Sequence, residues 1–237
     1  MEHILQIINV VGIISFAAAG AMVAIDKEND WFGVVLMSLI TCFSGGILRD
    51  MMVGQAIGRT IPAFFTDLKM EIIICISTAT VVFILAMIFK EQYVKEEATV
   101  EKINNVLDAL GIGVFTVAGT AAYLSLGPFV AITMGLISSV GGSVIRDVIL
   151  RSIPVILRKR IYAIPCIGGS AIYYVVTTLI MPDSPSANVV ATVCCIVFIF
   201  IIRMCATYFE WNIPKAIDFK KMRAFENEKK SQEEANK

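Results

Sequence analysis

The chain has 237 residues, of which 57% are hydrophobic and 17% charged, and its 20 basic residues equal its 20 acidic residues in number. Soluble domains carry about 25% charged residues, so this composition excludes an ordinary soluble domain and indicates a polytopic membrane protein. The formal net charge of zero indicates no particular partner, and no nucleic-acid partner is expected.

Uncharged apolar runs of roughly 17–22 residues follow one another along the chain, and each could cross a hydrocarbon core of about 30 Å. A single stretch, residues 109–145, would supply two of them, because Gly127-Pro128 divides it; one long tilted helix is the alternative. The predicted fold is an all-α membrane protein with seven transmembrane helices, which begin at residues 4, 31, 72, 109, 128, 161 and 184.

Basic residues are distributed unevenly between the two sides that seven spans define. One side would hold Arg49, Arg59 and Lys69, and the other would hold the remaining 17 of the 20 lysines and arginines. Cytoplasmic loops carry an excess of lysine and arginine. We therefore expect a multi-pass protein of the cell (inner) membrane, with its N-terminus outside and its tail in the cytoplasm.

A short motif occurs twice, about one hundred residues apart, and consists of three small residues, two aliphatic residues and Arg-Asp. The small residues are Ser44, Gly45, Gly46 in the first copy and Gly141, Gly142, Ser143 in the second. The charged residues are Arg49, Asp50, Arg146 and Asp147. Charges are costly in lipid and small residues weaken a helix, so we expect helix breaks that line a pore, with the charges in its path or at a gate.

Two other interpretations of the motif remain open. Straight helices would place Arg49 and Arg146 at the two membrane interfaces as ordinary anchors. The Arg-Asp pairs could also be structural clamps. A proline follows each copy, at Pro62 and Pro154, and predicts a turn at the membrane surface.

The chain also repeats on a larger scale. An offset of 99 residues superposes the first span on the fourth, and an offset of 97 superposes the two Arg-Asp pairs. Because each unit has three spans, the second enters from the opposite side, which predicts inverted repeats. The expected organisation is a first repeat over 1–90, a linker over 91–104, a second repeat over 105–182, a seventh helix over 183–208 and a cytoplasmic tail over 209–237.

Other polar features have ordinary explanations. Arg158, Lys159 and Arg160 are expected to fix the topology and contact anionic lipid head groups, with a specific lipid site as the alternative. Asp26, Asp30 and Asp108 are expected to be solvated or interfacial. No spacing of histidine or cysteine matches a metal site, and no catalytic motif is present, so neither an enzyme nor a cofactor is expected.

The two motif copies resemble the signature of the bacterial glycine transporter domain family, which occurs in tandem in trimeric intracellular cation channel family proteins. Residues 115–120 and 154–165 are also similar to family segments, and the resemblance covers about residues 5–205. It implies a homotrimer in which each protomer holds an hourglass pore beside its second and fifth helices, broken at their glycines. Ser44 and Ser143 depart from a triple glycine, and Pro62 stands where the family often has two prolines.

The function predicted from these features is permeation of a membrane. The resemblance favours a homotrimeric channel for monovalent cations, mainly potassium. A secondary transporter for glycine or another small neutral amino acid is the alternative, and a membrane scaffold without transport is a third hypothesis. The scaffold predicts unbroken second and fifth helices and no cavity.

The predicted topology can be tested with reporter fusions. Fusions after Lys27 and Arg160 should report a cytoplasmic location and a fusion after Lys69 an external one, because the basic loops stay inside. Paired alkaline phosphatase and fluorescent-protein fusions measure both cases. A cytoplasmic signal at Lys69 would contradict the count of seven spans.

Overall fold

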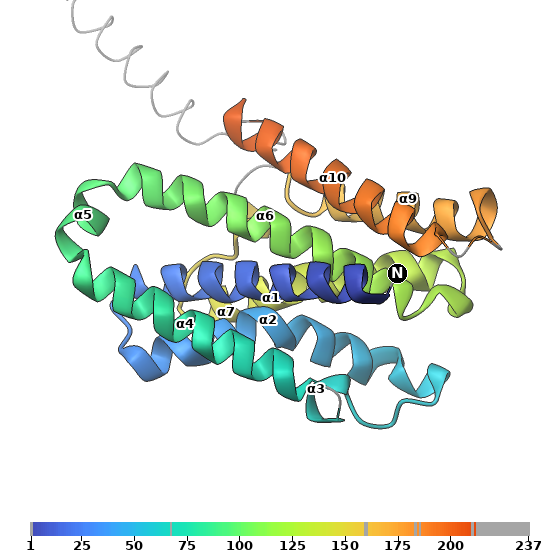
Figure 1. Cartoon of the computed structure of the whole chain (residues 1–237), viewed down its shortest axis with the longest axis horizontal. Helices are drawn as coiled ribbons and strands as arrows, with labels where there is room; N and C mark the ends of the chain where they lie inside the picture. Colours follow the sequence, from blue (N-terminus) through green and yellow to red (C-terminus); the bar gives the residue numbers. More distant parts are fainter. Residues whose placement is uncertain are drawn as a thin grey trace, which may run out of the picture.

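Apolar helices lie at all seven expected positions of the computed structural model, which describes residues 2–66, 68–158, 161–182, 184, 186–209 and 211 (Figure 1). Six are long and apolar enough to cross a membrane. They are α1 (Glu2–Ile25), α2 (Trp31–Val53), α4 (Lys69–Ile88), α6 (Glu97–Ala121), α7 (Pro128–Ile149) and α10 (Ala187–Tyr208). The seventh, α9 (Ile164–Val175), is shorter and continues into a π-helical turn, η3 (Val176–Ile180). The chain is an all-helical membrane protein.

The predicted division of residues 109–145 is confirmed. Helix α6 ends at Ala121, a 3₁₀ turn η2 (Leu124–Leu126) follows, and α7 begins at Pro128. Gly127 has a φ of 89°, a conformation that favours glycine, and proline suits the first position of a helix because its missing N–H has no helical partner there. The dipeptide therefore reverses the chain.

The stretch 91–104, expected as a linker, is largely helical. It contains most of the short helix α5 (Lys90–Lys95) and the first two turns of α6. Charged residues in this stretch, such as Glu97 and Lys102, are exposed, so the apolar run alone underestimated the length of α6. Helix formation needs only good helix formers here, because the polar side chains remain in water.

The helices pack in two sets of three. Helix α1 packs on α2 and α4, α6 packs on α7 and α9, and the sets meet where α1 contacts α6 and where α2 contacts α7. Helix α10 packs on α6 and α9, and Figure 1 shows it on the outer side of the bundle. The seventh helix therefore covers one set.

Glycines of both motif copies bring α2 and α7 into backbone contact. A Cβ atom added to Gly45 would overlap the carbonyl oxygen of Ser138, and one added to Gly142 would overlap that of Thr41. A Cβ on Gly141 would lie 3.1 Å from the Cα of Gly45. Small residues permit such close crossings of helices in membranes.

The predicted helix breaks at Ser44, Gly45, Gly46 and at Gly141, Gly142, Ser143 are wrong for this structure. Helices α2 and α7 continue through both motifs and end seven residues after the last glycine of each, at Val53 and Ile149. The glycines serve the crossing instead of a break, because packing against a neighbouring backbone holds them in helical conformation. Arg49 and Asp50 therefore lie within α2, and the chain leaves the helix at a 3₁₀ turn, η1 (Gly54–Ile57).

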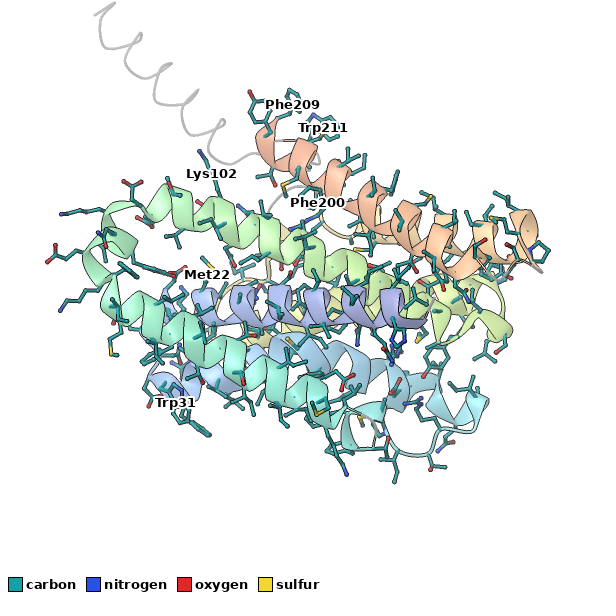
Figure 2. The ribbon with its side chains drawn as sticks, in the orientation of Figure 1. Met22, Trp31, Lys102, Phe200, Phe209 and Trp211 are labelled. Carbon is teal, nitrogen blue, oxygen red and sulfur yellow. The ribbon has the colours of Figure 1, made fainter. Side chains whose placement is uncertain are left out.

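Aromatic side chains gather where α10 ends. Figure 2 shows Phe209 and Trp211 together there, and their rings stack with centroids 6.1 Å apart. Trp31 starts α2 and donates from Nε1 to Thr80 Oγ1 at 3.2 Å. Tryptophan is enriched at membrane–water interfaces, so these residues suit the boundary at the end of the bundle opposite the N-terminus.

Adjacent glycines of the first motif allow a matched test of the crossing. Gly45→Ala should destabilise the protein by about 1–3 kcal/mol, as overpacking does, because its methyl group meets the Ser138 carbonyl. Gly46→Ala should be neutral or stabilising, because its methyl group meets only Arg49 Nη2 at 3.9 Å and alanine favours helix. Thermal unfolding in detergent measures both, and equal effects would contradict the packing role.

Candidate functional site

Each Arg-Asp pair closes within its own copy of the motif. Arg49 donates from Nε to Oδ1 of Asp50 at 2.8 Å, and its Nη2 lies 2.7 Å from the same oxygen. Arg146 donates from Nε and Nη2 to Oδ1 of Asp147 at 2.9 and 2.7 Å. Both copies therefore form the same two-nitrogen contact, and neither pair bridges to the other copy.

The second carboxylate oxygen, Oδ2, also has the same kind of partner in both copies. Oδ2 of Asp50 accepts from the amide of Ala63 at 2.9 Å, and Oδ2 of Asp147 accepts from that of Val155 at 3.1 Å. Each amide directly follows a proline and opens a one-turn helix, α3 (Ala63–Thr66) or α8 (Val155–Arg158). The aspartates thus fix the returning chain to the end of α2 or α7. Sequence reasoning predicted a turn after each proline but not this bond.

A cavity of about 380 Å³ reaches the first copy of the motif. It lies among α1, α2, α4 and α6 towards the end of the bundle that carries the N-terminus, and most of its lining is apolar. Its polar lining consists of Arg49 and Asp50, with Asn9 from α1, Glu71 from α4, Ser138 from the middle of α7, Tyr173 from α9 and Thr192 from α10. The cavity therefore extends from one end of the protein to the helix crossing.

Tyr123 holds the charged pair at the cavity wall. Its hydroxyl donates to Oδ1 of Asp50 at 3.0 Å, and the Arg49 guanidinium carbon lies 5.6 Å from its ring centroid. Arg49 also donates from Nη1 to Ser138 Oγ at 3.3 Å, which links α2 to α7. Arg49 thus points into the bundle, not towards lipid as an interfacial anchor would.

The second copy of the motif is closed off. Arg146 and Asp147 are each 3% exposed, and neither lines the cavity that reaches Arg49. The two copies therefore share their internal geometry, and the first copy differs in lining the cavity. A buried charge pair of this kind is tolerated because every charge has a charged partner at hydrogen-bonding distance.

Three further residues form a buried ionic cluster beside the second copy. Arg203 of α10 donates from Nη2 to Oδ2 of Asp108 on α6 at 2.6 Å, and its guanidinium carbon lies 4.0 Å from the Tyr162 ring centroid. The Tyr162 hydroxyl lies 3.1 and 3.0 Å from the two Asp108 oxygens and 3.3 Å from Ser143 Oγ. We call Asp108, Tyr162 and Arg203 the Asp108 cluster.

The expectation that Asp108 is solvated or interfacial is wrong, since Asp108 is 8% exposed and Arg203 7%. A charge at the end of an apolar run looks interfacial when its partner lies 95 residues away on another helix. The 99-residue offset held one clue, because it pairs Asp108 with Asn9, which lines the cavity.

The remaining predicted site residues divide by role. Gly46 lines the cavity, whereas Gly45, Gly141 and Gly142 lie in the crossing. Ser44 and Ser143 donate to carbonyls of their own helices, those of Ile40 and Val140. The predicted lipid contacts fall on the Arg158 side chain and on Lys159 and Arg160, which lie outside the described part of the chain.

Known proteins share this sequence pattern and this fold. A sequence model described as "Glycine transporter" matches residues 6–87 and 105–178, which together make up more than half of the chain. The chain belongs to the glycine transporter family. The two matched segments of the glycine transporter family coincide with the two sets of helices, α1–α4 and α6–α9.

Relatives of the chain include membrane proteins from several bacteria. UPF0126 inner membrane protein YadS of Escherichia coli (strain K12) is 33% identical over 169 residues, which cover 70% of this chain and 75% of YadS. UPF0126 membrane protein YvgT of Bacillus subtilis (strain 168) is 26% identical over 214 residues, covering 88% of this chain and 95% of YvgT.

Solved structures of trimeric intracellular cation (TRIC) channels have a similar fold. A prokaryotic TRIC channel crystallised in 0.5 M KCl matches with a TM-score of 0.73 and 27% identity, covering 90% of this chain and 100% of that chain. The TRIC orthologue from Rhodobacter sphaeroides matches with a TM-score of 0.72 and 27% identity, covering 88% and 99%. The fold of this chain is therefore similar to that of the TRIC channels.

Arg146→Lys tests whether the forked contact matters. A lysine ammonium is a point charge and cannot reproduce the two-nitrogen contact with Asp147, so stability should fall by about 1.5–3 kcal/mol. Arg151→Lys is the matched control, since Arg151 is exposed at the same end of α7. Thermal unfolding in detergent is the measurement, and equal melting temperatures for the two variants would leave Arg146 without a geometric role.

Proposed function

We propose that the protein is a homotrimeric channel for monovalent cations such as potassium, with one pathway inside each protomer. The observation that carries this proposal is the cavity, which reaches the buried Arg49–Asp50 pair and Ser138 without a second chain. The likeness to TRIC cation channels over nearly the whole chain supports the channel class and the trimer. The proposed route continues from the cavity past the α2–α7 crossing to the second motif.

The charges around the cavity favour cations. The lining itself holds one arginine and two carboxylates, those of Asp50 and Glu71, a formal charge of −1; Arg59, which is not in the lining, lies 3.8 Å from Oδ2 of Asp50. Because Arg49 is neutralised by Asp50 at 2.7 Å, Glu71 supplies the unbalanced charge. Walls of low dielectric constant strengthen the effect of such a charge on a passing ion.

The pathway is proposed to lie between two inverted repeats, residues 1–90 and 105–182. Reciprocal contacts support this arrangement. The 97-residue offset pairs position 41 with 138 and position 45 with 142, and in the structure 45 contacts 138 while 41 contacts 142. Phe16 and Phe115, paired by the 99-residue offset, stack with ring centroids 4.9 Å apart. Contacts between equivalent positions are what a two-fold axis in the membrane plane produces.

The orientation follows from the basic residues. With the N-terminus outside and the tail inside, the Arg49 cavity faces the exterior and the Asp108 cluster faces the cytoplasm. Aromatic residues at the start of α2 and the end of α10 would then mark the cytoplasmic boundary. In this orientation the Arg49 cavity is on the external side of the membrane.

A secondary transporter for glycine or a similar small amino acid is the second candidate. The one-sided cavity favours it, because a carrier exposes its site to one side at a time. A zwitterion could place its carboxylate near Arg49 and its ammonium group near Glu71, both of which line the cavity. The scaffold hypothesis predicted unbroken helices and no cavity; the helices are unbroken, but the cavity argues against a scaffold.

Reconstitution into liposomes distinguishes the candidates. We expect downhill potassium flux well above that of empty liposomes, without accumulation of labelled glycine, and a lower cation-over-anion selectivity in Glu71→Gln. Lys69→Gln is a control for the charge change, since Lys69 is exposed two residues away. Saturable glycine accumulation against its gradient would support the carrier, and the absence of both fluxes would overturn the proposed function.

A further inference from the structure

The two ends of the proposed pathway are built differently. At one end Asn9 lines the cavity, and at the other its counterpart at the 99-residue offset, Asp108, is covered by Tyr162 and Arg203. Arg203 comes from α10, which lies outside the two repeats. The residue that closes one end therefore has no equivalent at the other.

We propose that the Asp108 cluster is a gate that closes the pathway beside the second motif, and that it opens when the Tyr162 hydroxyl leaves Ser143. This inference rests on the proposed permeation function. The gate joins four elements, because α6 supplies Asp108, α7 supplies Ser143, α10 supplies Arg203, and Tyr162 precedes α9. Movement of α10 would withdraw the arginine and release the other two residues.

Hydrogen bonding around Arg203 suits a group that changes partners. Among the described residues its buried Nε has no hydrogen-bond partner, although Nη2 is bound to Asp108 at 2.6 Å. Buried donors are almost always satisfied by protein or by ordered water, and the contacts within the cluster leave Nε for such a partner. A small cavity of about 30 Å³ lies beside it, lined by polar side chains that include Asn105 and Thr207. That volume is enough for a water molecule beside the guanidinium.

Opening would also change the charge of the pathway. With Arg203 withdrawn, Asp108 would face the pathway at the position where Asn9 lines the other end. A released carboxylate would attract cations to the second half of the route, as Glu71 does in the first. Tyr162 and Arg203 thus hide the charge that the open pathway would use.

Tyr162→Phe tests the gate with the least disturbance. It removes the hydroxyl that joins Asp108 to Ser143 and keeps the ring beneath the Arg203 guanidinium. The native thiol of Cys166 is the reporter, since it is 0% exposed and lies 3.6 Å from the carbonyl oxygen of Tyr162. A membrane-impermeant maleimide is applied from each face of proteoliposomes, and mass spectrometry identifies the labelled peptide.

We expect labelling of Cys166 from the face opposite the N-terminus to rise roughly 3- to 10-fold in Tyr162→Phe. This is the change produced when the closed state of the gate loses the free energy of about one hydrogen bond. Potassium flux should rise with it. Labelling of Cys42, which lines the cavity at the other end, should not change. Tyr174→Phe is the control, because it removes a hydroxyl near the far end of α9, about 12 Å along the helix from Cys166.

Each outcome decides the question. Native labelling of Cys166 and native flux in a folded Tyr162→Phe protein would overturn the gate. If that variant does not fold, Asp108→Asn gives the second test, since it keeps the side-chain shape and removes the attraction to Arg203. Failure of both to fold would also overturn the gate, because the cluster would then be needed in every state. Increased labelling without any flux would support the gate and overturn the proposed function.

Discussion

The direct backbone contact between α2 and α7 is the constraint on which the rest of the structure depends. With side chains at Gly45 and Gly142 the two helices would separate, and Arg49 on α2 would lose its bond to Ser138 on α7. The same contact brings equivalent positions of the two motifs together in the middle of the bundle. Glycine is required there by the lack of space between the helices, because both stay regular and neither uses glycine's freedom to unwind.

Charged pairs can occupy this core because the arginine and the aspartate of each pair bond to each other. In both copies the arginine and aspartate are adjacent in sequence, so their bond forms with the helix itself and needs no distant partner. The free carboxylate oxygen then holds the amide after a proline, which ties the returning chain to the helix end. Both copies can therefore be clamps, as one interpretation of the sequence held, and the first copy in addition lines a cavity.

Much of the fold was predictable because it depends on properties local in sequence. Apolar runs located all seven helices, and Gly127-Pro128 located a reversal, since both act through length, hydropathy and backbone geometry. The state of the motif glycines was not predictable, because a close helix crossing outweighed their weak helix propensity. Partners distant in the chain were also missed, because the residues near Asp108 in sequence do not indicate an arginine 95 residues later.

The seventh helix, α10, makes the two ends of the bundle different, although the two sets of three helices otherwise correspond. Two inverted units would by themselves present equivalent ends, and the Arg-Asp geometry is the same in both. Helix α10 packs mainly on α6 and α9 and inserts Arg203 beside the second motif, whereas the first motif lines a cavity. A buried arginine on a single added helix is thus enough to make the ends unequal. Asp50 at the other end is held by Tyr123 of the α6–α7 connection, although Thr192 of α10 also lines the cavity there, so a movement of α10 would act most directly on the Asp108 cluster.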